Sequence, residues 1–133
     1  MKIVLDTNIL VSALLSPQGV PAQVLMLTLA GELRLLFDER VLEEYREVLS
    51  RPRFAIPTAQ VEEVLRQLEA DGELVAATPV TAALPDPDDR AFVEVALSGH
   101  ADALVTGNAR HFPPDLGITV LSPRALLQRL DSE

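Results

Sequence analysis

The chain has 133 residues, no cysteine and a formal net charge of −9 at pH 7. The lack of cysteine excludes disulfides, thiolate nucleophiles and cysteine-based zinc sites. A chain this acidic is a poor non-specific nucleic-acid binder, because phosphate affinity comes mainly from Lys and Arg. No apolar run reaches the length of a membrane span, and the first residues lack a signal-peptide pattern. We therefore expect one cytoplasmic domain over residues 1–133, without membrane contact.

The first third of the chain predicts one strand and two helices. Residues 2–6, KIVLD, form a short apolar run that ends in an acid, the pattern of a buried strand. Residues 7–16 have a helical pattern, which the segment PQGVP breaks. A second helix is predicted over residues 21–31, because Pro21 suits a first helical turn and Gly31 a helix end.

The middle of the chain predicts a strand followed by two helices. Residues 33–37, LRLLF, are a short apolar run of the strand type. Asp38 is placed to cap the helix predicted over residues 39–50. After a connector, Thr58 is expected to cap a further helix over residues 59–71, which a glycine ends.

The last part of the chain returns to alternating strands and helices. We predict a weak strand over residues 73–77, a helix over 88–98, strands over 102–106 and 118–122, and a closing helix over 123–130. Strands that alternate with helices imply right-handed crossovers and a mainly parallel sheet covered on both faces. The predicted fold is a single three-layer α/β/α domain.

Polar residues gather just after the predicted strands. Asp6 and Asn8 follow the first strand, and Thr106 and Asn108 follow the fourth. In open parallel sheets, ligands bind outside the carboxyl ends of the strands. These residues are therefore candidates for a functional site, together with acids at the starts of the helices.

The segment DPDDRAF carries three aspartates within four positions. Helix capping and the helix dipole explain Asp86 and Asp88. Asp89 differs, because at helical spacing it shares a face with Phe92 and Val93 and points toward the sheet. The dipole contributes about 0.3–1 kcal/mol, whereas a buried unpaired ion costs several kcal/mol. Asp89 therefore requires a cation.

Two further acids are candidates for the same site. Asp6 ends a buried strand, and the alternative is a capping role for the next helix. Glu44 lies nearest the apolar stripe of its predicted helix, whereas Glu43 and Glu47 lie nearly opposite it. The only lysine is Lys2, so no basic residue is an obvious partner for the cluster.

A divalent cation would resolve this excess of negative charge. Carboxylates that lie close together raise one another's pKa unless a cation neutralises them. Oxygen ligands favour Mg²⁺ or Mn²⁺ over zinc. Such a site suits metal-assisted hydrolysis of a phosphodiester.

Other catalytic motifs are absent from the sequence. The glycine patterns of dinucleotide-binding folds and of phosphate loops do not occur. A haloacid-dehalogenase-like site requires a second acid where Asn8 stands. His100 and His111 have no ligand pair near them in the sequence, so both are expected at the surface rather than on a metal.

With these residues assembled, the chain resembles the PIN domain family, metal-dependent ribonucleases that include the VapC-like toxins of toxin–antitoxin modules. The resemblance covers essentially the whole chain and rests on four segments: IVLDTNILVSALL, DERVLEEYREVLSRPRF, DPDDRAFVEVAL and ADALVTGNARHF. It implies that Asp6, Glu44 and Asp89 are the catalytic, metal-binding acids. It also implies that Asn8 and Thr106 support the site by hydrogen bonding.

The sequence departs from this family at the fourth catalytic position. Many members have an acid there, and this chain has Asn108. A neutral amide offers an oxygen but adds no charge to hold a second cation. We therefore expect one ion, Mg²⁺ or Mn²⁺, to bind well and a second to bind only with substrate phosphate.

The resemblance also implies an RNA substrate and a cognate antitoxin protein as partners. A homodimer is expected because Leu25, Met26 and Leu29 are predicted to be exposed apolar residues of a helix. Three arginines are candidates to steer RNA, a solvated basic edge being the alternative, and they are Arg46, Arg51 and Arg53.

Two rival functions remain open from the sequence. One is a non-catalytic PIN-like module that binds RNA or a protein, which Asn108 and the acidic charge favour. The other is a structure-specific DNA nuclease, which the small size of the chain disfavours. The intact set of Asp6, Glu44 and Asp89 favours a ribonuclease over both.

Overall fold

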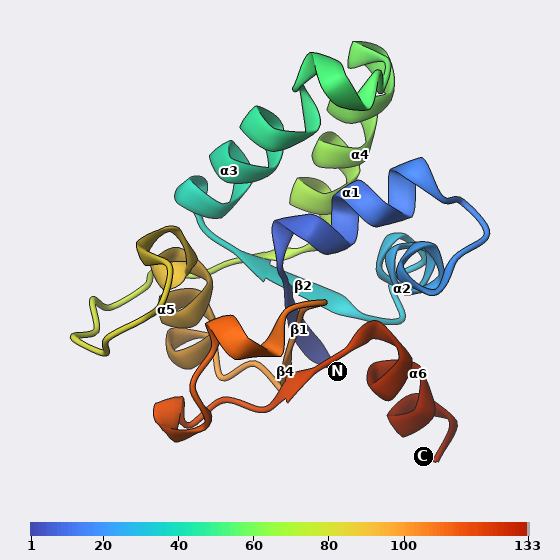
Figure 1. The fold of residues 1–133 in the computed structure, drawn as a ribbon. Coiled ribbons are helices and arrows are strands. Elements are labelled where there is room, and N and C mark those ends of the chain that lie inside the picture. The colour runs from blue at the N-terminus through green and yellow to red at the C-terminus, as the bar shows by residue number, and fades with distance from the viewer. Residues whose placement is uncertain (133) are drawn as a thin grey trace.

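The computed structural model of the protein describes residues 1–132, and Figure 1 shows its arrangement. The helices are α1 (Thr7–Leu15), α2 (Val20–Leu29), α3 (Glu39–Leu49), α4 (Thr58–Asp71), α5 (Arg90–Ser98) and α6 (Pro123–Asp131). The strands are β1 (Lys2–Leu5), β2 (Arg34–Phe37), β3 (Glu73–Leu74), β4 (Ala103–Val105) and β5 (Val120–Leu121). The order of strands and helices along the chain is the predicted one.

The five strands form one sheet in the order β3-β2-β1-β4-β5, and every pair is parallel. The central strand β1 pairs with β2 on one side and β4 on the other, with Leu5 opposite Val105. The prediction of a parallel sheet in an α/β fold is confirmed. The last residues of β1 and β4 lie side by side, so whatever follows them shares one edge of the sheet.

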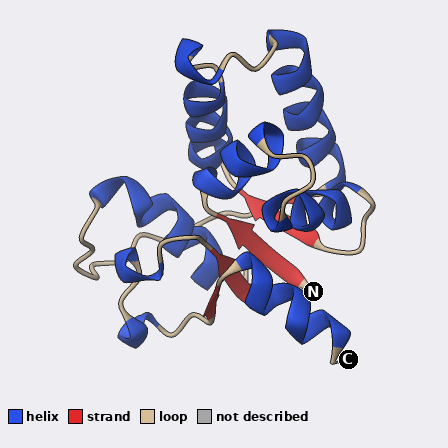
Figure 2. Ribbon diagram, turned by 45° about the vertical axis from the view of Figure 1, so that its right-hand side comes forward, coloured by secondary structure: helices blue, strands red, loops and turns tan. Residues whose placement is uncertain are grey.

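The helices cover both faces of the sheet, as Figures 1 and 2 show. The chain moves from β1 to β2 to β3 in one direction, and α1 to α4 lie together on one face. The connection from β3 to β4 returns in the opposite direction, so a crossover of the same hand places α5 on the other face. Helix α6 runs beside β5 and packs against α2.

The core is formed by strand residues that are buried from both faces. Ile3, Val4 and Leu5 of β1 are inaccessible to solvent, as expected for a parallel strand covered by helices on each side. Tyr45 of α3 is also buried, and its hydroxyl donates to the Leu5 carbonyl oxygen at 2.6 Å. Phe92 of α5 lies near the Tyr45 ring, with ring centroids 6.2 Å apart.

Two of the predicted helix caps are tested by their hydrogen bonds. The Asp38 carboxylate accepts from the Val41 amide at 3.0 Å, which confirms it as the cap of α3. The prediction for Thr58 is wrong, because α4 begins at Thr58 and Pro57 precedes it without a side-chain cap. The ring of Pro57 fixes an extended turn that sets the entry of the helix.

Gly72 ends α4 as predicted. A glycine is required there because neighbouring backbone atoms leave no room for a side chain. A Cβ atom at this position would lie 2.7 Å from the carbonyl oxygens of both Leu35 and Leu68. The chain therefore passes against β2 too closely for a side chain. Gly31, after α2, has φ of +83°, a conformation that glycine adopts without strain.

Several predicted elements are shorter than expected, including the strand over residues 118–122, which is reduced to Val120–Leu121. The strand of residues 73–77 is reduced to Glu73–Leu74 at the edge of the sheet. The predicted helix over 88–98 begins with a 3₁₀ turn, Pro87–Asp89, and becomes α-helical at Arg90.

The predicted apolar patch on α2 is smaller than expected. Leu25 is buried and Leu29 is half-buried, whereas Met26 is 65% exposed. Leu25 points into the core because α2 is packed between α1, α4 and α6. Among residues 1–132, no single helix is long and apolar enough to span a membrane. The α1–α2 pair meets such a test only together, and its two helices are bent by 105°.

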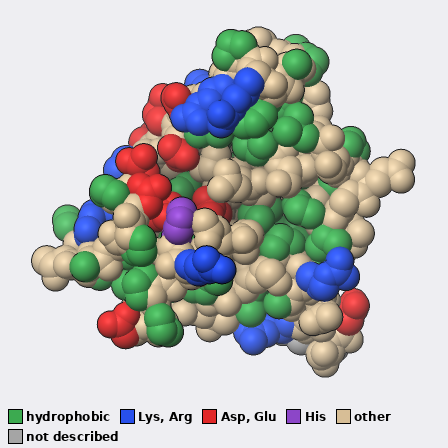
Figure 3. Space-filling view, viewed as in Figure 1, with side chains coloured by type: hydrophobic (Ala, Val, Ile, Leu, Met, Phe, Trp, Pro, Cys, Tyr) green, Lys and Arg blue, Asp and Glu red, His purple; other side chains and the backbone are tan. Residues whose placement is uncertain are grey.

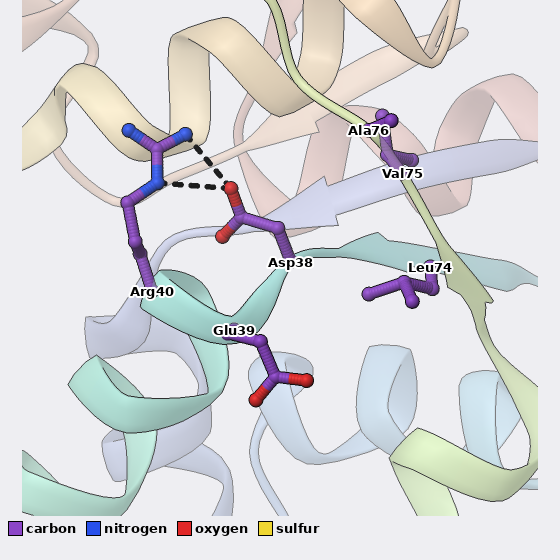
Figure 4. A pocket seen from close by; sticks show the side chains of 6 residues that line it. All are labelled: Asp38, Glu39, Arg40, Leu74, Val75 and Ala76. Atoms are coloured by element: carbon purple, nitrogen blue, oxygen red, sulfur yellow. Dashed lines mark hydrogen bonds and ion pairs between the residues drawn. The ribbon is translucent and has the colours of Figure 1, made fainter.

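A buried ion pair connects α5 to α3. Glu94 of α5 is only 4% exposed, and its carboxylate accepts from Arg40 at 2.7 Å and from the Val80 amide at 2.9 Å. Arg40 also donates to Asp38, as Figure 4 shows at a shallow depression between the start of α3 and β3. Burial raises the pKa of Glu94, but the Val80 amide and Arg40 outweigh it and leave that pKa below its usual value.

The same helix also holds the loop that precedes it. Arg90 donates to the carbonyl oxygens of Val80 at 2.7 Å and Ala82 at 2.9 Å. Together with the contact between Glu94 and Val80, these bonds tie the segment of residues 78–86 to α5. The loop that ends at Asp86 is therefore positioned by α5.

We predict that Glu94→Gln lowers the free energy of unfolding at pH 7 by about 1–3 kcal/mol, because charge-assisted hydrogen bonds to a buried group are lost. A carboxyl whose folded pKa is depressed contributes stability above its unfolded pKa and loses it as the pH falls. The difference between wild type and variant should therefore narrow from about pH 5 to about pH 3. Urea unfolding measures it, with Glu69→Gln on the exposed face of α4 as the control. A difference that does not depend on pH would contradict the prediction.

Candidate active site

The site lies where the sheet topology places ligands in open α/β folds. The chain leaves β1 toward β2 and leaves β4 toward β5, so the two connections diverge at neighbouring strands. This switch point opens a crevice at the carboxyl ends of the strands. Asp6 and Thr106 are the residues that follow β1 and β4, and the Asp6 amide donates to the Val105 carbonyl oxygen at 2.9 Å.

Asp6 is buried and oriented by its neighbour. Its side chain is 5% exposed and makes no capping hydrogen bond to α1, which excludes the capping alternative. The Thr106 hydroxyl donates to Asp6 Oδ2 at 2.7 Å, and the Asn108 amide nitrogen donates to Thr106 Oγ1 at 3.0 Å. Thr106 thus fixes one Asp6 oxygen, and the other accepts no hydrogen bond from the described residues.

Glu44 reaches the same place from α3. It is half-buried, and the Thr7 hydroxyl donates to Glu44 Oε2 at 2.9 Å. Glu43 and Glu47 are exposed and form ion pairs with arginines of their own helix and the segment that follows it. This confirms the prediction that Glu44 faces inward, whereas Glu43 and Glu47 face solvent.

Asp89 points inward as predicted and is 6% exposed. Burial, followed by the negative charges of Asp6 and Asp86, raises the pKa of Asp89 to about 6, although His111 acts in the opposite direction. A carboxyl group in this state resists ionisation unless positive charge is brought to it.

Asp86 combines a capping role with a place in the site. Its carboxylate accepts from the Asp88 amide at 2.9 Å, the cap predicted for this turn, and Asp88 itself is exposed. Ligand atoms of Asp86, Asp89 and His111 all lie within 4.8 Å of one another. The sequence explained Asp86 by capping alone and missed this grouping.

His111, which has no ligand pair near it in the sequence and was expected at the surface, is 36% exposed and lies against two residues of the site. His111 Nδ1 lies 3.1 Å from Asp89 Oδ2, and His111 Nε2 lies 2.9 Å from Asn108 Nδ2. A short 3₁₀ helix, Ala109–His111, turns the chain back over the site directly after β4. The spacing of three residues from Asn108 to His111 is the one sequence signal for this contact. His100 is exposed, as expected.

These side chains surround a cavity of about 190 Å³. Figure 3 shows acidic side chains gathered beside a histidine on this face, with basic side chains on either side. The residues that line the cavity are Asp6, Thr7, Asn8, Glu44, Val48, Arg51, Arg53, Phe54, Asp86, Asp88, Asp89 and His111. Asn8 is among the lining residues. Thr106 and Asn108 are not, but they hydrogen-bond to the lining residues Asp6 and His111, respectively.

The donor set fits a divalent cation. Asp6, Glu44 and Asp89 come from three separate elements, and no Lys or Arg among residues 1–132 forms an ion pair with any of them. One Asp6 oxygen accepts no hydrogen bond within residues 1–132. Several oxygens around a partly dry cavity suit Mg²⁺ or Mn²⁺.

Comparison with known proteins assigns the family. A sequence model described as PIN domain matches residues 2–110, and the chain therefore belongs to the PIN domain family. Its fold resembles that of VapBC2 from Rickettsia felis, solved bound to a DNA fragment from their promoter, with a TM-score of 0.60. The match has 17% sequence identity and covers 92% of this chain and 98% of that chain, so it concerns the fold. No curated protein matches the chain.

We predict that Asp89→Asn stabilises the protein when divalent ions are chelated. The pKa of Asp89 is raised from 3.8 to about 6, so stability present below about pH 4 is lost as the pH rises to about 6. Asparagine cannot ionise and should raise the free energy of unfolding by about 1–2 kcal/mol at pH 8, since one pKa unit is worth about 1.4 kcal/mol and the lost His111 contact offsets part of the gain.

Urea unfolding in EDTA at about pH 4 and pH 8 measures this effect. The exposed neighbour provides the control, because Asp88→Asn should change stability little at either pH. An Asp89→Asn protein that is less stable than wild type at pH 8 would show that Asp89 is not under electrostatic stress.

Proposed function

We propose that this protein is a divalent-metal-dependent endoribonuclease and the toxin of a toxin–antitoxin module. One observation carries the proposal: Asp6, Glu44 and Asp89 converge on one cavity, and no lysine or arginine among the described residues forms an ion pair with them. Membership of the PIN domain family supports a nuclease. A cytoplasmic location remains a prediction.

Threonine hydroxyls orient two of the three acids. Asp6, Glu44 and Asp89 would hold Mg²⁺ or Mn²⁺, which supplies positive charge at the phosphate and lowers the pKa of a bound water. Thr106 keeps Asp6 in a fixed orientation, and Thr7 does the same for Glu44. These hydrogen bonds remove side-chain freedom before substrate arrives, which lowers the entropic cost of assembling the site.

Basic residues at the cavity supply contacts for a nucleic-acid backbone. Arg51 and Arg53 line it and are exposed, and the Arg53 guanidinium lies 4.8 Å from the centroid of the Phe54 ring. Arg46, also considered from the sequence, pairs with Glu43 and Glu62 and does not line the cavity. We assign phosphate steering to Arg51 and Arg53, with the half-buried Phe54 ring at the cavity available for contact with a base of single-stranded RNA.

The acidic surface supports a basic protein partner. The net charge of −9 and the carboxylate cavity complement a basic antitoxin segment that would cover the site. The likeness to VapBC2 supports a partner of this kind. The non-catalytic alternative would bind RNA or a protein without cleaving RNA, so a cleavage assay separates the two functions.

The direct test incubates pure protein with labelled RNA and DNA in Mg²⁺, Mn²⁺ or EDTA. We expect internal cleavage of RNA that EDTA abolishes. Cleavage of DNA alone would identify a DNA nuclease, and binding of RNA without cleavage under all three conditions would support the non-catalytic alternative.

We predict that Asp6→Asn and Glu44→Gln each reduce RNA cleavage at least about 100-fold, the loss typical when a group that stabilises transition-state charge is removed. The matched control is Glu43→Gln, one residue away on α3 but exposed and outside the cavity lining. Circular dichroism verifies that each variant is folded. Wild-type activity in Asp6→Asn or Glu44→Gln would refute the assignment of the site.

We predict a homodimer that uses the surface between α2 and α6. Met26 is 65% exposed and lines a depression there with Leu27 and Leu127, whereas Leu25 is buried. Light scattering at micromolar concentration should give twice the monomer mass, and Met26→Glu should shift it toward monomer. A monomeric wild-type protein under these conditions would contradict the dimer.

A further inference from the structure

A second group of ligands lies beside the three acids of the proposed function. Asp86, Asp89 and His111 bring one ligand atom each within 4.8 Å of the others. Asp86 and His111 line the cavity with Asp6 and Glu44. The group thus shares Asp89 with the acids already described and adds a nitrogen donor to an otherwise oxygen-rich site.

The distance between His111 and Asp89 matches that of two adjacent ligands of one ion. Neighbouring positions of an octahedral ion with bonds of about 2.1 Å lie about 3 Å apart. His111 Nδ1 and Asp89 Oδ2 are separated by 3.1 Å. Asp89 is more than nine-tenths buried, so its carboxylate has little access to water that would otherwise neutralise its charge.

Asn108 holds the opposite side of the His111 ring. In the arrangement seen here, Asn108 Nδ2 donates to His111 Nε2, which places the ring proton on Nδ1 toward Asp89. Half a turn of the amide would present its oxygen instead, and His111 would then carry its proton on Nε2 and leave Nδ1 free for a cation. Histidines that bind metals usually donate their other ring N–H to such an acceptor.

An asparagine performs this role because it can serve both tautomers of the ring. A carboxylate at position 108 could only accept a hydrogen bond. The backbone of Asn108 is fixed through Thr106 Oγ1, which also holds Asp6. Asparagine in place of the family's usual acid at position 108 therefore removes a negative charge. It also supplies a side chain that can either donate to or accept from the His111 ring.

We propose that His111, with Asp86 and Asp89, forms a nitrogen-containing cation subsite that favours Mn²⁺, or another transition-metal ion, over Mg²⁺. Imidazole suits transition metals, whereas Mg²⁺ prefers oxygen ligands and retains its water. The proposal rests on the proposed function only in taking this cavity to be its metal site, and it concerns binding rather than cleavage.

The test is pulsed electron paramagnetic resonance of Mn²⁺ bound to the purified protein without RNA. Directly coordinated ¹⁴N modulates the Mn²⁺ echo, and we expect this modulation in the wild type. His111→Asn should remove it and weaken Mn²⁺ binding at least about tenfold, with a change below about threefold for Mg²⁺. Calorimetry measures both affinities, and circular dichroism verifies the fold.

The other histidine provides a matched control. His100 is exposed and has φ of +54°, a conformation that asparagine tolerates, so His100→Asn changes the same residue type without strain. It should keep the ¹⁴N modulation and the Mn²⁺ affinity of the wild type.

The outcomes separate this proposal from the proposed function. A wild-type spectrum with oxygen ligands only, or a ¹⁴N signal that persists in His111→Asn, would overturn the subsite. Equal weakening of Mg²⁺ and Mn²⁺ in His111→Asn would overturn the preference. Nitrogen-coordinated Mn²⁺ in a protein that cleaves neither RNA nor DNA would support the subsite and contradict the nuclease.

Discussion

The buried Asp6 carboxylate at the end of β1 is the constraint on which the site depends. A strand covered on both faces brings its last residue into a dry environment, where an ionised side chain without a partner costs several kcal/mol. Hydrogen bonds, rather than a lysine or arginine, support the acids of the site. Thr106 donates to Asp6, Asn108 contacts both Thr106 and His111, and His111 contacts Asp89. These contacts link the two buried acids around the cavity and leave its centre negative.

The parallel topology explains why these residues meet. β1 and β4 are neighbours in space but about one hundred residues apart in the chain, and their connections diverge at the edge where Asp6 and Thr106 emerge. Glu44 arrives from α3 on one face, and Asp89 arrives from the start of α5 on the other. A cavity that both layers supply can be covered by substrate from the open edge of the sheet.

Much of this arrangement could be predicted from local patterns. The helical spacing of Asp89 with Phe92 and Val93 gave its direction, and the apolar stripe of α3 distinguished Glu44 from Glu43. Such periodicity predicts side-chain direction because the apolar face of a helix packs against the core. His111 could not be found this way, since its position depends on a short 3₁₀ turn after β4 and on contacts with residues distant in sequence. The burial of Glu94 likewise depends on Arg40, more than fifty positions away.

Helix α5 joins the stability of the protein to the geometry of its site. The 3₁₀ turn that leads into α5 positions Asp89, whereas Arg90 and Glu94 hold the loop that leads to Asp86. The backbone of Val80 is held on both sides, because its amide donates to Glu94 and its carbonyl oxygen accepts from Arg90. This loop has little sheet structure of its own, so the two charged side chains replace the missing ladder of hydrogen bonds. Asp86 lies at the end of this loop, so loss of the hydrogen bonds with Arg90 and Glu94 would displace Asp86 within the cavity. The charged residues of α5 outside the cavity therefore help to set the distance between Asp86 and His111.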